Sequence, residues 1–238
     1  MTTVMISQPM YFPWVGFMAQ MALADIMIWL DDVQFSKGSF TNRIQVKTAA
    51  GPKWMSIPLK DRGSKILIRD IEMIDDTTPK RHKDFLYNTF NKANYVAEML
   101  QTFEDVWMPK DLLVNNLIDS AEGLADAIGL SDRQTFRSSE LSVDGYGSKR
   151  VLNLVKAVSG DTYLTGHGAL RYLDHPSFNR SGIDVLYMDY APKPWPQDHG
   201  KFTPYVTALD LIAHVPVDLR YDYLAPQTLA WQTFLEQN

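Results

Sequence analysis

The amino-acid sequence predicts an α/β protein with a mostly parallel core sheet. Three observations support this prediction: a βαβ unit at the N-terminus, an added β-hairpin after it, and a helical middle segment. The chain has 238 residues, of which 45% are hydrophobic, so a single core can bury most of the apolar side chains. We therefore expect one domain over residues 1–238, with a helical excursion over about 79–130.

The N-terminal unit consists of a strand, a short helix and a second strand. Residues 4–7 favour a short strand, and Pro9 and Pro13 mark the turn after it. Residues 16–23 can form a short helix. Residues 26–30 are continuously apolar, which is typical of a strand that is buried on both faces of a parallel sheet. This order predicts a βαβ unit, although its helix is short for a crossover.

The next segment predicts antiparallel strands. Residues 40–46 and 54–58 flank the turn residues 50–52, which are Ala-Gly-Pro, and this pattern is typical of a β-hairpin. Residues 66–73 alternate apolar and polar side chains, so we expect a further strand there, with an irregularity near Asp70.

The middle of the chain predicts helices. One begins at Pro79, because proline is favoured at the first helical position, with Thr77 or Thr78 as its cap. Two later apolar stripes have helical spacing and end before Gly129 and Gly160. Their members are Leu113, Leu117, Ala121, Leu124 and Ile128, then Val151, Leu154, Val155 and Val158.

The remaining elements are two strands and a short helix. Residues 162–164 and 183–187 are apolar and β-branched enough to form strands, and a Gly-rich turn follows the first of them. Residues 206–214 favour a short final helix, and the tail after it is rich in Pro, Tyr and Leu.

The composition excludes several classes of protein. The chain has no cysteine, which excludes thiol nucleophiles, disulfides and Cys-ligated zinc and favours a reducing compartment. No segment reaches the roughly 20 apolar residues of a transmembrane helix, and no basic region precedes the first apolar run as in a signal peptide. We therefore expect a cytoplasmic protein with no membrane partner.

Charge is unevenly distributed along the chain, whose formal net charge is −5. Residues 37–69 contain eight basic residues and the single acid Asp61, a net charge of +7 that leaves −12 for the remainder. The basic residues are Lys37, Arg43, Lys47, Lys53, Lys60, Arg62, Lys65 and Arg69. Such a segment indicates an anionic partner, either a small or nucleotide-linked molecule or a nucleic acid. The alternative is a solvated strand face.

The loop over residues 7–16 is the first candidate for a binding site. It holds two prolines, three aromatic residues and a glycine directly after a predicted buried strand. Ligands of open α/β sheets bind outside the carboxyl ends of the strands. Gln8, Tyr11 and Trp14 offer hydrogen bonds and stacking, and Gly16 permits close approach. The alternative is an aromatic lid over the core.

Polar residues also follow the second predicted strand. Asp31, Asp32 and Gln34 come directly after it, so we expect them to face the same cleft. A carboxylate there can bind a ribose or sugar hydroxyl, hold Mg²⁺ or act as a general base, and Asp32 is our candidate base. The alternative is that the carboxylates cap local backbone groups.

The histidines differ in their expected roles. His167 lies between two glycines after a predicted strand, a position that suits a general base, and His199 lies in a similar turn. We expect His82 to be solvated, His175 to be a turn residue, and His214 to interact with a helix C-terminus. No pair has metal-site spacing, so we predict no metal centre.

Arg43 and either Lys149 or Arg150 are candidates for binding an anion, and Asn42 is a further substrate-binding candidate. The alternative for Lys149 is a solvated surface charge. Arg43 follows Asn42 in the basic hairpin, and its guanidinium suits bidentate binding of a phosphate or carboxylate. Lys149 and Arg150 lie in the first turn of a predicted helix, whose N-terminus attracts anions.

The chain resembles the WbqC-like family. The resemblance is most specific in Ile6-Ser-Gln-Pro-Met-Tyr-Phe-Pro-Trp-Val-Gly-Phe17, Leu30-Asp-Asp-Val-Gln-Phe35 and Phe40-Thr-Asn-Arg43. It continues in Gly147-Ser-Lys-Arg150, Asp161-Thr-Tyr-Leu-Thr-Gly166, Gln197 with Phe202, and Leu209-Asp-Leu211. The chain departs from the family pattern at Trp195, where a tyrosine is expected, and after His214, where an Asn-Gly pair is missing.

The resemblance implies a transferase that attaches an amino acid or acyl group to a sugar-type or nucleotide-linked acceptor. The expected settings are bacterial surface polysaccharide (O-antigen) and modified phage DNA bases, with Gln197 and His199 among the substrate-binding residues. No cofactor is identified beyond an ATP-derived or aminoacyl donor. One alternative is a non-catalytic scaffold protein. Another is a divergent nucleotidylyltransferase, although Val15 and Phe17 stand where that loop would carry histidine.

Overall fold

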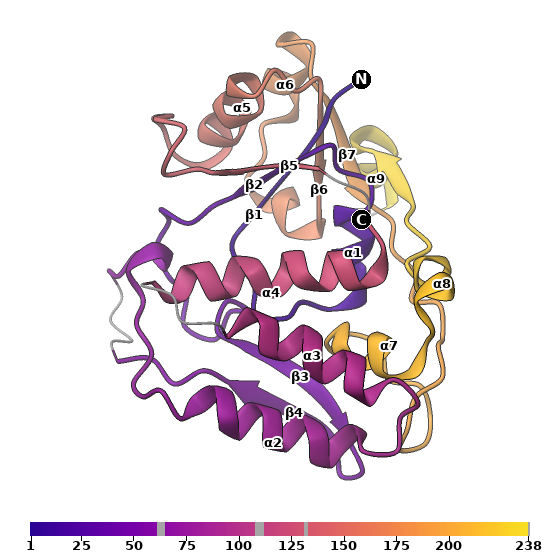
Figure 1. The fold of residues 1–238 in the computed structure, drawn as a ribbon. Helices are drawn as coiled ribbons and strands as arrows, with labels where there is room; N and C mark the ends of the chain where they lie inside the picture. Colours follow the sequence, from indigo (N-terminus) through magenta and orange to yellow (C-terminus); the bar gives the residue numbers. More distant parts are fainter. Residues whose placement is uncertain (61–64, 108–111, 131–132, 238) are drawn as a thin grey trace.

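The computed structural model describes residues 1–60, 65–107, 112–130 and 133–237. Among these residues, six strands form one sheet in the order β5-β2-β1-β6-β7-β8. Every pairing is parallel except that of β7 with β8, which confirms the predicted mostly parallel sheet (Figure 1). The strands are β1 (Thr3–Ser7), β2 (Ile26–Trp29), β5 (Gln134–Arg137), β6 (Thr162–Thr165), β7 (Asp184–Met188) and β8 (Thr228–Ala230).

The predicted βαβ unit is present at the centre of the sheet. From β1 the chain passes through α1 (Val15–Met21) to β2, which pairs with β1 in parallel. It later returns to β6 on the opposite side of β1. The strand order therefore reverses between β1 and β6, which makes this pair the topological switch point of the sheet.

Successive side chains along the strands belong to two separate hydrophobic cores. Val4, Ile6, Ile26 and Ile28 belong to one cluster, with side chains from α5 (Gly147–Ala157) and α6 (His175–Arg180). Met5, Met27 and Trp29 belong to the other, with side chains from α1 and α4. Because neighbouring residues point to opposite faces, continuously apolar strands are needed to fill both cores.

The middle segment is helical, as predicted. It contains α2 (Thr78–Phe90), α3 (Val96–Val106) and α4 (Leu113–Ile128), and α2 has proline in its first turn. Gly129 ends α4 with a φ of 84°, a left-handed conformation that glycine adopts without strain. Within the described part of the chain, no helix is both long and apolar enough to cross a membrane.

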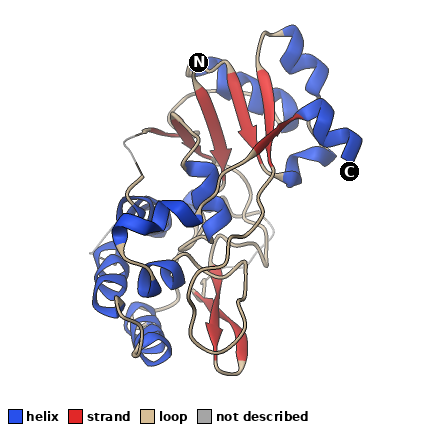
Figure 2. Ribbon diagram, turned by 90° about the vertical axis from the view of Figure 1, so that its right-hand side faces the viewer, coloured by secondary structure: helices blue, strands red, loops and turns tan. Residues whose placement is uncertain are grey.

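The predicted hairpin is a separate two-stranded sheet of β3 (Arg43–Thr48) and β4 (Gly51–Ser56). Figure 2 shows it away from the main sheet, beside the helices of the middle segment. The prediction of a further strand over residues 66–73 was wrong. This segment contains the 3-10 helix η1 (Ile68–Asp70), since the buried residues Ile68 and Ile71 are three positions apart.

The C-terminal quarter of the chain is mostly short helices. The predicted final helix is α7 (Leu209–His214), and β7 corresponds to the strand expected over residues 183–187. Elements that the sequence did not predict are the edge strands β5 and β8. The others are η2 (His167–Arg171), α8 (Val217–Arg220), η3 (Tyr221–Tyr223) and α9 (Trp231–Gln237). The helix α6 was not predicted either, and its first residue is His175, which we expected in a turn.

A fully buried arginine joins the helices of the lower half of the molecule. The Arg220 guanidinium donates to both carboxylate oxygens of Glu98, at 2.6 and 2.7 Å. It also donates to the backbone carbonyls of Ala127, Ile212 and Val215. These groups come from α3, α4 and α7 and from the residue that follows α7, so one side chain satisfies acceptors on several elements at once.

We predict that replacing Arg220 with methionine destabilises the protein by about 3–5 kcal/mol, because the buried carbonyls and Glu98 lose their common donor. Urea unfolding followed by circular dichroism measures this change. The matched control is Arg171→Met at an exposed arginine, which should change stability by less than about 0.5 kcal/mol. Equal stability of the two variants would contradict the role given to Arg220.

Candidate functional site

A cavity of about 630 Å³ opens at the switch point of the sheet. Ser7 and Gln8 line it from the end of β1, and Thr165, Gly166 and His167 line it from the end of β6. This is the position at which open α/β sheets bind ligands. The structure therefore brings together four of the predicted site residues, which are Gln8, Trp14, Gly16 and His167.

An aromatic wall closes one side of this switch-point cavity. The Trp14 ring lies 5.4 Å from the ring of Tyr190 and 5.3 Å from that of Tyr205, and all three line the cavity. A β-carbon on Gly16 would lie 2.2 Å from the Trp14 ring. The absence of a side chain at Gly16 is thus what lets the indole lie against α1. Pro13 and Trp14 are anchored in turn by Ala208 and by an isolated β-bridge to Thr207.

His167 forms part of the opposite wall and is exposed at the cavity. Its Nε2 lies 2.9 Å from the backbone carbonyl of Met188, and its ring packs edge-on against Phe234. A carbonyl can only accept, so Nε2 carries the proton and Nδ1 is the basic nitrogen of the neutral ring. This geometry fixes the tautomer that a general base requires.

The remaining polar lining is neutral at physiological pH. Burial raises the pKa of the Tyr163 and Tyr172 hydroxyls, so both remain protonated. Gln20 lines the cavity and donates to the carbonyl of Leu164 at 3.1 Å. Among the described residues, no Asp, Glu, Lys or Arg lines the cavity. It therefore suits an uncharged ligand group that has hydroxyls and an apolar or planar surface.

Asp31 is buried, at 1% exposure, and does not line the cavity. Its Oδ1 accepts from the Ser139 backbone N–H at 3.1 Å and from the Ser138 hydroxyl at 3.2 Å, and its Oδ2 accepts from the Ser139 hydroxyl at 2.8 Å. These bonds hold the turn after β5. The partners of Asp31 lie 107 and 108 positions further along the chain, so this carboxylate links the loop after β2 to the turn after β5 and does not cap the local backbone.

Asp32 forms an ion pair with Arg150 at 2.5 Å and accepts from the Ser138 hydroxyl at 2.6 Å. Partial burial acts to raise the pKa of Asp32, but the hydrogen bonds and charge of Arg150 and the Ser138 hydroxyl lower it below its usual value. The neighbours Leu30 and Val151 line the cavity. The ion pair thus supports the cavity wall through these neighbouring residues. Lys149 is exposed and does not line the cavity.

Tyr11 is fully buried and lies outside the cavity. Its hydroxyl lies 2.9 Å from Nδ1 of His82, whose Nε2 lies 3.1 Å from the Ser56 carbonyl. The expectation that His82 is solvated was wrong, because this ring is buried between the hairpin and α2. Burial, opposed in part by the Ser56 carbonyl and reinforced by the charge of Arg81, lowers the pKa of His82 to about 4.

Three of the other predicted residues lie in or near the hairpin. Asn42 and Arg43 line a second cavity, and the Asn42 amide donates to the Ile57 carbonyl at 2.8 Å. Gln34 is exposed and forms an isolated β-bridge with Leu67. The three residues do not line the switch-point cavity.

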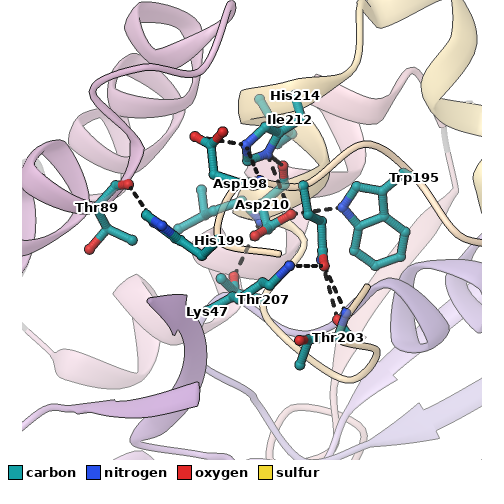
Figure 3. Close-up of polar contacts among 12 residues, drawn as sticks. Lys47, Thr89, Trp195, Asp198, His199, Thr203, Thr207, Asp210, Ile212 and His214 are labelled. Atoms are coloured by element: carbon teal, nitrogen blue, oxygen red, sulfur yellow. Dashed lines mark hydrogen bonds and ion pairs between the residues drawn. The ribbon is translucent and has the colours of Figure 1, made fainter. Parts of the chain in front are cut away.

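A polar network joins the segment of Gln197 and His199 to Lys47 of the hairpin and to Thr89 of α2. Figure 3 shows Lys47, His199 and Thr89 in this network. Gln197 accepts from the Nζ of Lys47 at 3.2 Å and from the Thr203 backbone N–H at 2.8 Å. His199 Nε2 lies 3.2 Å from the Thr89 carbonyl. Lys47 is only 3% exposed, so this network fixes residues 195–205 onto the hairpin and is separate from the cavity.

His214 is the ionisable centre of the same region (Figure 3). Its Nδ1 lies 2.8 Å from the Asp210 carbonyl and 3.4 Å from the Asp210 carboxylate, and its Nε2 lies 3.4 Å from the Asp198 carboxylate. Burial acts to lower the pKa of His214, but the hydrogen bonds and charge of Asp210, with a bond to Asp198, raise it to about 9. The two carboxylates favour the protonated ring, whereas the Asp198 backbone N–H, 3.2 Å from Nε2, can donate only to the neutral ring.

Sequence reasoning missed most of the aromatic lining. Tyr190 and Tyr205 lie in irregular segments with no periodic pattern, and Tyr163 and Tyr172 were not singled out. A signal was available for Tyr163, because it lies near the carboxyl end of a predicted buried strand. Within the described ranges, no group of three or more His, Asp or Glu side chains could hold a metal ion.

Comparison with known proteins gives one family and one relative. The model of the WbqC-like protein family matches residues 8–221. The chain is 29% identical over 233 residues to a protein named "Uncharacterized protein Rv1507c" from Mycobacterium tuberculosis (strain ATCC 25618 / H37Rv). That match covers 93% of this chain and 99% of the relative. No solved structure shows a significant match.

We predict that Gly16→Ala displaces the Trp14 ring and destabilises the protein by about 1–3 kcal/mol, the usual cost of overpacking. Urea unfolding and near-ultraviolet circular dichroism measure the two effects. Gly123→Ala in α4 is the control, because its new β-carbon would meet only Val106, at 3.8 Å. That variant should be neutral or more stable by up to about 1 kcal/mol. An unchanged aromatic spectrum for Gly16→Ala would contradict the packing described for Trp14.

We predict that His214 titrates near pH 9 in the folded protein. Because its folded pKa of about 9 exceeds its unfolded pKa of about 6.5, its contribution to stability is fully present below the unfolded value. That contribution is lost as the pH rises through the folded one. NMR titration of the ring protons, assigned with His214→Gln, measures the midpoint. A midpoint at or below about 6.5 would contradict the paired imidazolium.

Proposed function

The chain belongs to the WbqC-like protein family, and from this premise and the site geometry we propose that it is a cytoplasmic transferase. It attaches an amino acid or acyl group to the hydroxyl or amine of a sugar-type or nucleotide-linked acceptor. We place the reaction in the biosynthesis of a bacterial surface polysaccharide or of a modified phage DNA base. Its donor is ATP-derived or aminoacyl.

The switch-point cavity is the observation that carries this proposal. A neutral lining of tyrosine and serine hydroxyls, glutamine amides and a tryptophan ring is what a sugar or a nucleoside needs, since sugars present hydroxyls and an apolar face. The cavity volume of about 630 Å³ is within the range of small-molecule sites. Among the described lining residues, His167 is the one histidine, the residue type most often used as a general base.

We assign His167 as the general base. Nδ1 of the ring takes the proton of the acceptor hydroxyl or amine while that oxygen or nitrogen attacks the donor's acyl carbonyl carbon. The bond from this carbon to the leaving group then breaks, and the leaving group departs with the electron pair. The Met188 carbonyl holds Nε2–H and so stabilises the imidazolium formed in this step.

Asp32 has a positioning role in this proposal. Its lowered pKa and its bond to Arg150 make it a weak base, but the pair holds Leu30 and Val151 against the cavity. The predicted catalytic role of Asp32 is therefore the weaker of the two assignments. The same experiment tests the assignments of His167 and Asp32.

The alternative function is a non-catalytic protein that binds the acceptor for partner enzymes. One observation favours it: among the described residues, the cavity lining supplies a single histidine and no carboxylate. Formation of any covalent product by the purified chain would exclude this alternative. A nucleic-acid partner at the basic residues 37–69 would instead give an affinity that falls steeply with salt.

We predict that His167→Ala lowers turnover on the order of 10²–10⁴-fold, the usual contribution of a general base, whereas Asp32→Asn has a smaller effect. Product formation from an aminoacyl-adenylate and a panel of nucleotide sugars and nucleosides is measured by mass spectrometry. Lys156→Ala, at an exposed position of α5, should retain wild-type turnover. If His167→Ala and Asp32→Asn both keep wild-type turnover, the assignment of these residues is wrong.

A further inference from the structure

A second cavity, of about 610 Å³, lies between the hairpin and the N-terminal turns of α2. Three cationic side chains line it: Lys37 before the hairpin, Arg43 at the start of β3, and Arg81 in α2. None of its described lining residues is acidic. Unlike the switch-point cavity, this hairpin cavity therefore has a strongly positive lining.

Among the described residues, no carboxylate pairs with Arg43, which other groups hold in place. Its guanidinium donates to the Gly38 carbonyl and lies over the Trp54 ring, 4.1 Å from the ring centroid. Its buried Nε has no hydrogen-bond partner among the described residues. Gly38 has a φ of 84°, a turn conformation that suits glycine. These contacts orient the guanidinium before any ligand binds, which reduces the entropy that a ligand would have to offset.

Arg81 is oriented by groups at the start of α2. It donates to the Thr78 hydroxyl at 2.9 Å and forms a long contact of 3.4 Å with Asp75, which is outside the lining. The Lys37 side chain is exposed, with no ion-pair partner in the part of the chain that the structure describes. The neutral His82 side chain also lines the hairpin cavity. The cavity thus presents two guanidinium groups and one ammonium.

Two exposed aromatic rings lie beside these cations. Phe40 is 44% exposed and Trp54 is 43% exposed, and their ring centroids are 5.8 Å apart. Neither ring lines the hairpin cavity itself, but the Arg43 guanidinium lies over the Trp54 ring and so joins the two features. Cations that bind phosphate oxygens, next to rings on which a planar group can stack, are the combination found where proteins bind nucleotides.

We propose that the hairpin cavity is a second binding site, separate from the switch-point cavity, that takes the diphosphate group of a small molecule. Arg43 and Arg81 bind the phosphate oxygens through paired N–H donors, and Lys37 adds a third positive charge. Trp54 and Phe40 offer a surface for a nucleobase where the diphosphate carries one. The site stands on its own geometry and does not require the transferase reaction.

The test is calorimetric titration of the full chain with pyrophosphate, inorganic phosphate and uridine diphosphate. We expect saturable binding of pyrophosphate that weakens as sodium chloride is added. Arg43→Gln and Arg81→Gln should each weaken it about tenfold or more, because each removes charge-assisted hydrogen bonds. Tighter binding of uridine diphosphate than of pyrophosphate, lost in Trp54→Ala, would assign the ligand as a nucleotide.

The matched control is Lys80→Gln, which removes a charge from the residue before Arg81. The Lys80 side chain is exposed, paired with Asp84 and outside the lining, so pyrophosphate affinity should stay within about twofold. Thermal unfolding of each variant confirms that it is folded. The proposal is overturned if the wild-type chain binds none of the three probes, or if both arginine variants bind pyrophosphate as tightly as the wild type.

The transferase proposal and the diphosphate-site proposal can be contradicted independently of each other. His167→Ala should bind pyrophosphate as the wild type does, because His167 lies in the other cavity. Loss of pyrophosphate binding in His167→Ala would contradict the separation of the two sites. Normal binding in a chain that catalyses no transfer would leave the diphosphate site standing and remove the transferase.

Discussion

The central position of β1 is the constraint on which the structure depends. This strand has parallel partners on both edges and apolar side chains on both faces, so the chain must supply two neighbouring strands and two layers of helices around it. The neighbours are β2, reached directly, and β6, reached after the hairpin and the helical segment. Because the chain adds strands outward from β1 in opposite directions, the loops after β1 and β6 diverge. The space between them is the switch-point cavity.

The fold was predictable where local pattern and burial coincide. Residues 26–30 show no alternation because both faces of β2 are covered, and the same reasoning found β1, β6 and β7. The edge strands β5 and β8 were missed because half-exposed residues such as Gln134 and Thr228 have no such pattern. Ile66 and Ile68, then Ile71 and Met73, have strand spacing on either side of the irregularity expected near Asp70, but residues 68–70 form a 3-10 helix. His82 was taken as solvated, since its lysine and arginine neighbours in sequence do not reveal the hairpin packed over it.

The location of the site could be predicted from the sequence better than the identity of the residues that line it. Gln8, Trp14, Gly16 and His167 meet because each lies in the segment that follows β1 or β6. Gln197 and His199 lie elsewhere, since an irregular segment gives no indication of the surface on which it packs. The arginines that we expected to bind an anion also differ in their surroundings. Arg150 is neutralised by Asp32, whereas Arg43 is left with a carbonyl and an indole ring. Only tertiary contacts distinguish a paired guanidinium from one that lacks a counter-charge.

The pairing of Val4 with Tyr163 also has a consequence for the order of events during synthesis. β1 can pair with β2 as soon as residue 29 leaves the ribosome, but its other edge has no partner until β6 has been made. At roughly 5–20 residues per second, that interval is on the order of ten seconds. During it, an apolar strand has a row of free backbone donors and acceptors, the arrangement that promotes edge-to-edge association. The nascent N-terminal half is therefore open to association through this edge until β6 has been made.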